Sequence, residues 1–166
     1  MEFARWLSLN TGNAAEVKAL IALGSNLGNR QAHLDAGLAA LAQLGSVLPS
    51  PMVMETPDES GLGPAYLNSV ALLECEQTNP QRLLEALFRI ELAQRRDRSA
   101  GRNAPRTLDL DIITVEGQCG TWHWPRPEGL AVPWDTLELI LPHPRARQRE
   151  FVMAPIRALG LESLVP

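Results

Sequence analysis

Apolar and polar residues alternate along the first third of the chain with the periods of short strands and one helix. Residues 18–23 form an apolar run that ends in a Gly-Ser-Asn turn, and this pattern predicts a buried strand. From 29 to 44, four leucines recur at helical spacing, and Gly45 stands where a left-handed helix cap favours glycine. Residues 47–55 resemble a strand, but two prolines confine it to a sheet edge or to its second half.

The middle of the chain repeats this order with stronger signals. A loop rich in glycine and proline, 56–65, precedes a strand that begins at Tyr66. Asn79, followed by proline, opens the clearest helix, whose broad apolar stripe ends at a polar segment, 95–106, that we predict as a loop. Strict alternation around two aspartates then predicts a strand over 107–115.

The last third of the chain is less regular. Residues 116–138 combine tryptophans with more prolines than a central strand tolerates. We expect a short strand at 139–141, a turn or short helix at 145–150, a strand at 151–156 and a weakly helical tail. Because the regular spacing of βαβ units is missing, the sequence predicts an α+β fold with an antiparallel sheet covered by helices.

The two ends of the chain differ in organisation. Residues 1–16 have no sustained period, so we treat them as an N-terminal extension outside the fold and as a candidate for disorder. Residues 17–166 are long enough for one compact domain with a core of its own, and we expect a single domain there.

Composition and charge exclude several classes of protein. With a net charge of -4, the chain lacks the basic field of a general nucleic-acid binder. Its apolar runs fall far short of the roughly 20 residues that cross a bilayer, and the broken apolar patch near the start is unlike a signal peptide. Cys75 and Cys119 have no ligand-like neighbours, which favours free thiols over a disulfide or a zinc site. We therefore expect a cytoplasmic protein that contacts neither nucleic acid nor a membrane.

Two aspartates in the predicted strand 107–115 are the first candidates for chemistry. Asp109 and Asp111 are two positions apart, so their side chains point the same way with Cα atoms roughly 6.5 to 7 Å apart. Two such carboxylates are able to share hard divalent cations that clamp a reacting phosphate. A solvent-facing strand that simply alternates produces the same pattern, so the pair alone leaves both interpretations open.

Arginines gather on both sides of this acidic pair in the sequence. Lys18 is the only lysine, a bias that a GC-rich genome explains as readily as a need for bidentate phosphate donors. The segment just before the acidic strand nevertheless holds a dense group of cations: Arg95, Arg96, Arg98, Arg102 and Arg106. A second group follows His143, at Arg145, Arg147 and Arg149. Acids for a metal beside arginines for phosphate oxygens are what a site for a magnesium nucleotide needs, whereas a solvated loop is the alternative.

Several short motifs resemble one known family in order and spacing. They are Ala-Leu-Gly-Ser-Asn-Leu-Gly at 22–28, Glu-Thr-Pro at 55–57, Tyr-Leu-Asn at 66–68, Arg-Ile-Glu at 89–91, Pro-Arg-Thr-Leu-Asp-Leu-Asp-Ile at 105–112 and Leu-Pro-His-Pro at 141–144 before Arg-Glu-Phe at 149–151. Over about 18–156 the chain resembles 6-hydroxymethyl-7,8-dihydropterin pyrophosphokinase of the folate pathway. The resemblance implies a ferredoxin-like α+β fold and a Mg²⁺-dependent enzyme. It also implies two Mg²⁺ ions and transfer of pyrophosphate from ATP to the hydroxymethyl group of the pterin, with release of AMP.

The resemblance also implies roles for individual residues. Asp109 and Asp111 would bind the metal ions and, with Arg98 and Arg106, form the catalytic group. The ATP-binding residues would be Leu84, Glu91, Arg96, Arg98, Arg102, Arg106, Ile112, His143 and Arg149. The pterin substrate would be bound by Thr56, Pro57, Tyr66, Asn68 and Phe151, with Asn68 reading the hydrogen-bonding edge of the ring and Phe151 stacking on it.

Some positions depart from the family pattern. Asn103 replaces a tryptophan of the family, and Phe88 stands where a polar residue is usual. The segment 116–138 is also longer than usual, and one of its tryptophans either replaces the lost aromatic or packs in the core.

These departures keep two other hypotheses open beside an active pterin pyrophosphokinase. One is a paralogue with a different pterin-like acceptor, and the other is a non-catalytic module that binds nucleotide or pterin. A nucleic-acid binder is the least favoured. We expect a monomer or a weak homo-oligomer.

Overall fold

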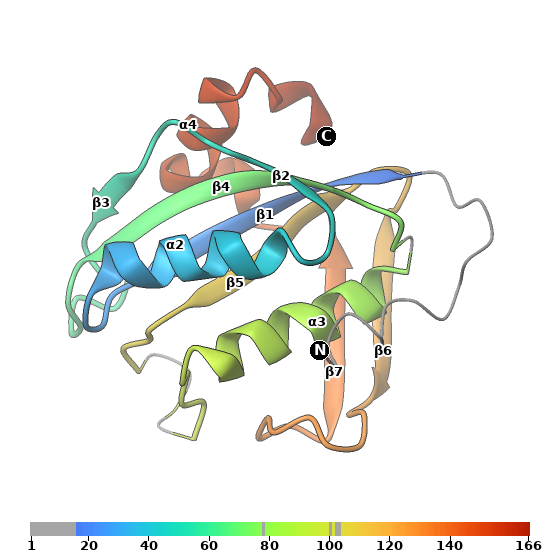
Figure 1. Cartoon of the computed structure of the whole chain (residues 1–166), viewed down its shortest axis with the longest axis horizontal. Coiled ribbons are helices and arrows are strands. Elements are labelled where there is room, and N and C mark those ends of the chain that lie inside the picture. Colours follow the sequence, from blue (N-terminus) through green and yellow to red (C-terminus); the bar gives the residue numbers. More distant parts are fainter. Residues whose placement is uncertain (1–15, 78, 100, 102–103) are drawn as a thin grey trace.

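The computed structural model describes residues 16–77, 79–99, 101 and 104–166, in which one antiparallel sheet carries helices on both faces (Figure 1). The strands are β1 (Val17–Ser25), β2 (Ser46–Pro49), β3 (Met54–Thr56), β4 (Tyr66–Cys75), β5 (Asp109–Val115), β6 (Gly120–Pro125) and β7 (Thr136–Leu141). The helices are α2 (Arg30–Leu41), α3 (Pro80–Ala93) and α4 (Glu150–Ala158), with short 3₁₀ turns at η1 (Ala146–Gln148) and η2 (Glu162–Leu164).

Strand order confirms the predicted fold class. The main sheet runs β2-β4-β1-β5, with β3 paired to the same strand, β4, as β2. Pairing of β1 with β4 and with β5 is antiparallel throughout. Counted along the chain, β1, α2, β2 with β3, β4, α3 and β5 follow the β-α-β-β-α-β order of ferredoxin-like folds. β6 and β7 pair only with each other in a second, two-stranded sheet.

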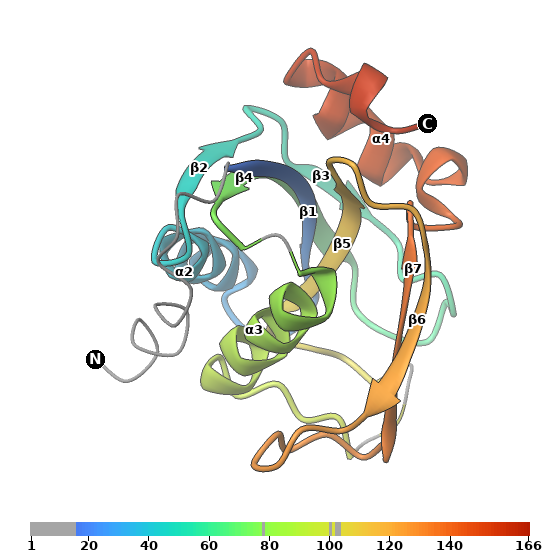
Figure 2. The ribbon, with the colours of Figure 1, turned by 90° about the vertical axis from the view of Figure 1, so that its right-hand side faces the viewer.

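The helices divide the core into two layers. On one face of the sheet, α2 and α3 pack against Ile21, Leu23 and Leu73. On the other face, α4 packs against Leu20 and Val70, so that β1 contributes alternate residues to each layer. The view in Figure 2 shows α2 and α3 together, α4 on the far side of the sheet, and β6 with β7 beside α3.

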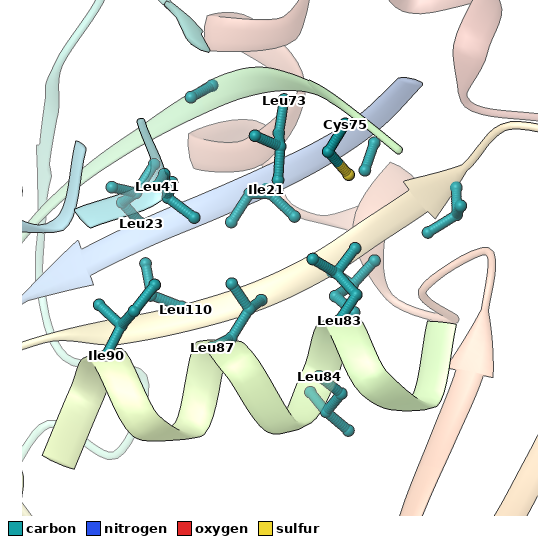
Figure 3. Packing of buried hydrophobic residues seen from close by; sticks show 14 of the residues in the cluster. Ile21, Leu23, Leu41, Leu73, Cys75, Leu83, Leu84, Leu87, Ile90 and Leu110 are labelled. Carbon is teal, nitrogen blue, oxygen red and sulfur yellow. The ribbon is translucent and has the colours of Figure 1, made fainter. Parts of the chain in front are cut away.

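Helix α3 connects the sheet to the rest of the molecule. Asn79 caps it by accepting hydrogen bonds from the first-turn amides, as its sequence position predicts. Leu83, Leu87 and Ile90 point at the sheet, whereas Leu84 lies on the side turned away from it (Figure 3). No helix in the described residues has both the length and the apolar character to cross a membrane.

Two sequence-based assignments are wrong. Residues 151–156 are helical and not a strand, because Val152, Met153 and Ile156 are buried at helical spacing against the sheet; a short apolar run does not distinguish the two states. The segment 116–138, predicted to be too rich in proline for a central strand, contains β6 and the start of β7. Its prolines are tolerated because these strands form a separate two-stranded sheet.

The second wrong assignment concerns Gly45, whose backbone φ angle is outside the left-handed region. It is required by close approach, since a Cβ there would come within 2.1 Å of the Glu74 carbonyl oxygen. The edge strand predicted at 47–55 is present but is divided into β2 and β3 around Pro51.

Truncating Leu87, which is fully buried between α3 and the sheet, should lower the free energy of unfolding. We expect Leu87→Ala to cost about 2 to 5 kcal/mol in urea denaturation, from lost burial and the cavity left behind. The matched control is Leu62→Ala, at a leucine that is 93% exposed, where the change should stay within about 0.5 kcal/mol. Similar losses for the two variants would contradict this assignment of the core.

Candidate active site

A cavity of about 960 Å³ opens along β5, the edge strand of the main sheet. Its walls come from the ends of β1 and β4, from α3, from the first turn of α4, and from β7. The Pro-His-Pro segment after β7 is fixed to β5, because the His143 amide donates a 2.8 Å hydrogen bond to the Ile113 carbonyl. Segments far apart in sequence are thus brought around one strand.

The acidic pair faces this cavity from β5. Asp109 and Asp111 both line it, while Leu108 and Leu110 point into the core, as the alternation predicted. The register places Asp109 opposite Gly24 of β1. Gly24 in turn lies opposite Asn68 of β4. Because Gly24 has no side chain, Asn68 and Asp109 face the same open space on either side of it.

A fully buried carboxylate organises the arginines beneath the cavity. Glu91 of α3 is 0% exposed and accepts hydrogen bonds from the Leu110 amide and from Arg96 Nη1, both at 2.7 Å. Arg98 forms a further ion pair with it. Arg96 also binds Asp109, whose second carboxylate oxygen is 3.2 Å from Arg106 Nη1. A continuous chain of ion pairs therefore runs from α3 to the acidic pair.

The two aspartates differ in electrostatic environment. Burial alone would raise the pKa of Asp109, but Arg96 and Arg106 outweigh it and hold this pKa below its ordinary value of 3.8. Asp111 makes no hydrogen bond or ion pair with a described residue. Burial, and then the neighbouring charge of Asp109, raise the pKa of Asp111 to about 6. The pair therefore keeps one carboxylate paired and one available to a ligand.

Burial also shifts the pKa values of two other groups, Glu91 and His143. The pKa of Glu91 rises to about 7, because desolvation outweighs the arginines and the amide that bind the carboxylate. Burial and the nearby Arg149 and Arg145 lower the pKa of His143, so its imidazole is neutral at pH 7. Its Nδ1 accepts a hydrogen bond from the Arg145 amide, which leaves the proton on the other ring nitrogen.

Aromatic and apolar groups form two compartments on either side of this charged centre. Tyr66 and Phe151 lie on the side of Asn68, where the Asn68 amide donates to Thr56 Oγ1 at 2.9 Å. Leu84, Phe88 and Trp134 line the side formed by α3 and β7. Both groups present aromatic or apolar side chains of the kind that bind a flat ring.

Most residues predicted for the site line the same cavity. They are Thr56, Pro57, Tyr66, Asn68, Leu84, Arg96, Arg98, Arg106, Asp109, Asp111, Ile112, His143, Arg149 and Phe151. Glu91 lies behind the wall and holds the arginines. Arg102 and Asn103 are outside the described residues.

Sequence reasoning did not identify Glu59, which pairs with Arg149 across 3.0 Å from the loop before β4. A single acid in an irregular loop carries no periodic signal that would have indicated this pair.

Comparisons with known proteins identify the family of the chain. A family model described as 7,8-dihydro-6-hydroxymethylpterin-pyrophosphokinase matches residues 20–160. The chain belongs to this family. It is therefore an enzyme, a pyrophosphokinase, and the resemblance stated from its motifs is confirmed.

Individual pyrophosphokinases of this family are similar over most of their length. The chain is 33% identical to the 2-amino-4-hydroxy-6-hydroxymethyldihydropteridine pyrophosphokinase of Haemophilus influenzae, over 90% of this chain and 86% of that protein. It is 34% identical to the protein of the same name from Bacillus subtilis, over 83% and 75%. It is 33% identical to that from Pseudomonas aeruginosa, over 90% and 84%.

The donor set suits a metal that is shared with a bound phosphate. Within the described residues, no three His, Cys, Asp or Glu side chains form a group able to hold a metal ion alone. Asp109 and Asp111 offer two carboxylates at the cavity wall. Mg²⁺ typically binds proteins through one or two carboxylates and takes its remaining ligands from water and substrate phosphates. The acidic pair therefore fits Mg²⁺ that is held together with a nucleotide.

Neutralising Asp111 should stabilise the protein when no divalent metal is present. The folded-state pKa of about 6 exceeds the ordinary 3.8, so the contribution of Asp111 to stability is complete below pH 3.8. It is lost as the pH rises through about 6. We expect Asp111→Asn to raise the free energy of unfolding by on the order of 1 to 2 kcal/mol at pH 7.5. Urea denaturation in EDTA measures this difference.

The pH dependence provides the control for this prediction. The gain in unfolding free energy of Asp111→Asn should shrink between pH 6 and pH 4. The ionised Asp109 stabilises the folded protein instead, and its contribution changes only below pH 3.8. Asp35→Asn, at an exposed position of α2, should have the same free energy of unfolding as the wild type at pH 7.5. If Asp111→Asn showed the same stability as the wild type at pH 7.5 in EDTA, the assigned environment of Asp111 would be wrong.

Proposed function

We propose that this enzyme transfers pyrophosphate from ATP to the hydroxymethyl group of 6-hydroxymethyl-7,8-dihydropterin, in folate biosynthesis. The reaction yields AMP and the pterin diphosphate. The observation that carries the proposal is the acidic pair of β5, which faces an arginine-lined cavity between two apolar compartments. One compartment accommodates the nucleobase and the other the pterin, and the phosphates lie between them over the acids.

Asp109 and Asp111 would hold two Mg²⁺ ions together with the phosphate oxygens of ATP. When bound, Mg²⁺ neutralises charge on the transferring group and on the leaving AMP. Asp109 is kept ionised and oriented by Arg96 and Arg106. Asp111 is free of such pairing within the described residues, so its carboxylate is able to turn toward a ligand.

Cationic and neutral donors complete the phosphate-binding surface. Arg98, Arg106 and Arg149 supply guanidinium groups along the cavity, where bidentate hydrogen bonds to phosphate oxygens are favourable. The neutral His143 offers one ring N–H without adding charge. These donors are fixed in advance by the ion pairs behind them, so they need little rearrangement as negative charge shifts toward AMP.

The compartment beside Asn68 suits the pterin. Tyr66 and Phe151 provide aromatic rings, and Asn68 provides an amide that can match a ring edge with alternating donors and acceptors. The Asn68 amide N–H bonded to Thr56 fixes its orientation and turns its carbonyl oxygen toward the space left by Gly24. A pterin held there places its hydroxymethyl group toward the acidic pair.

The chemistry then requires positioning more than covalent participation by the protein. The hydroxymethyl oxygen attacks the β-phosphorus of ATP. The bond between this phosphorus and the oxygen that bridges it to the α-phosphorus breaks, AMP leaves with that oxygen, and the hydroxyl proton is released. The test is AMP formation by the purified protein with ATP, Mg²⁺ and the pterin, beside a reaction without pterin. Absence of pterin-dependent AMP would reject the proposal.

Asp111→Asn should reduce pterin-dependent AMP formation at least about a hundredfold, since the amide is a weak Mg²⁺ ligand and carries no charge. Circular dichroism should show an intact fold, because Asp111 faces the cavity and not the core. Asp35→Asn, on the exposed face of α2, serves as the matched control and should keep the wild-type rate. Near-normal activity of Asp111→Asn would remove Asp111 from the metal site.

Replacing Asn68 should affect the pterin and spare the nucleotide. We expect Asn68→Leu to weaken pterin binding at least about tenfold, because the ring edge loses its hydrogen-bonding partner. Binding of MgATP, measured by calorimetry without pterin, should stay within about twofold, since Asn68 lies on β4, which β1 separates from the acidic pair of β5. Equal weakening of both ligands would contradict the division into two compartments.

A further inference from the structure

The segment between β6 and β7 contributes Trp134 to the cavity wall, and the proposed function assigns this residue no individual role. Trp134, just before β7, lines the cavity together with Phe88 of α3, and the two ring centroids are 6.2 Å apart at an angle of 46°. The Arg98 guanidinium lies over both rings, 4.6 Å from the centroid of Phe88 and 5.0 Å from that of Trp134. Trp134 is 42% exposed, so neighbouring residues cover it only in part.

The other tryptophans of the same segment have a different environment. Trp122 and Trp124 pack against the main core, and Trp124 Nε1 donates a 2.9 Å hydrogen bond to Glu85 of α3. Trp134 belongs to none of the buried clusters, and its indole N–H has no hydrogen bond among the described residues. A structural role therefore accounts for Trp122 and Trp124 but leaves Trp134 without one.

The backbone around Trp134 is nevertheless fixed. Leu130, Val132 and Leu137 form a small buried cluster beneath it, packed against α3. The Arg126 amide donates to the Asp135 carbonyl at 2.8 Å, and Arg126 Nη1 donates to the Val132 carbonyl at 3.2 Å. These bonds hold the chain on both sides of Trp134. The indole is thus an exposed flat surface on a rigid support, which is favourable for binding a planar ligand.

We propose that Trp134 is the surface on which the nucleobase of the donor nucleotide stacks, with Phe88 as the second ring of this compartment. The inference rests on the proposed function and extends it to a positioning residue in the segment 116–138. Arg98 links this surface to the acidic pair through Glu91 and Arg96. A flat ring beside a line of arginines fits a ligand in which a base is followed by phosphates. Stacking on an indole is open to every base, so Trp134 provides affinity without selecting among purines.

The test separates contributions of the base from contributions of the phosphates. Calorimetry without pterin measures the binding of MgATP and of magnesium tripolyphosphate, which carries the same phosphates and no base. We expect Trp134→Ala to weaken MgATP binding about tenfold and to leave tripolyphosphate binding unchanged. Trp134→Phe keeps a ring and should lose less than about threefold. MgGTP should weaken by the same factor as MgATP.

Control variants exclude indirect effects. Trp122→Phe changes a tryptophan of β6 that does not line the cavity, and this variant should bind both ligands like the wild type. If Trp134→Ala fails to fold, Trp134→Leu keeps bulk without an aromatic ring and should show the same selective loss.

Two results would overturn the inference. Equal weakening of MgATP and tripolyphosphate would mean that Trp134 acts on the phosphates through Arg98, and unchanged MgATP binding would mean that the base lies elsewhere. The proposed function is judged separately by pterin-dependent AMP formation. A base-dependent loss of binding in a protein that forms no AMP would support this inference while rejecting that function.

Discussion

The buried carboxylate of Glu91 is the interaction on which the site depends. It lies wholly inside the protein and is paired with two guanidinium groups and the amide of Leu110. Removing one partner of such a buried ion pair typically costs about 3 to 5 kcal/mol, because the other charge is left without compensation. The same contacts join α3 to β5 and fix the loop that carries Arg96 and Arg98. Stability and the position of the phosphate-binding groups are therefore coupled in one network.

The acidic pair shows the opposite balance. Asp109 and Asp111 repel each other on one face of β5, and the arginines compensate mainly Asp109. A site that holds an uncompensated carboxylate at its wall sacrifices folding stability for the ability to bind cations. The register of the sheet makes this arrangement possible, because Gly24 between Asn68 and Asp109 leaves room for a ligand at the centre. The site thus depends on the open space beside Gly24 and on the charge of Asp111, which is unpaired among the described residues, and a tightly packed apolar core would retain neither.

Elements with a strong period could be predicted from the sequence. β5 alternates strictly, α3 has a cap and a broad apolar stripe, and both were assigned correctly. Helix α4 was not, because residues 151–156 form a short apolar run and only tertiary contact with Leu20 and Val70 reveals its helical spacing. Candidate site residues were found from motifs, but a motif does not show how deeply a residue is buried or on which side of the cavity wall it lies. The motifs did not show that Glu91 stands behind the cavity wall or that Glu59 pairs with Arg149.

Contacts with α3 explain how the long segment 116–138 is ordered. Proline and tryptophan gave it no clear period, and its order comes instead from contacts with α3. Glu85 holds Trp124 of β6, while Glu91, less than two turns further along the same helix, holds the arginines and β5. Both the apolar wall and the charged wall of the cavity are thus anchored to the same helix, α3. A shift of α3 would move the apolar wall and the charged centre together, which keeps the spacing between a flat ring and its phosphates constant.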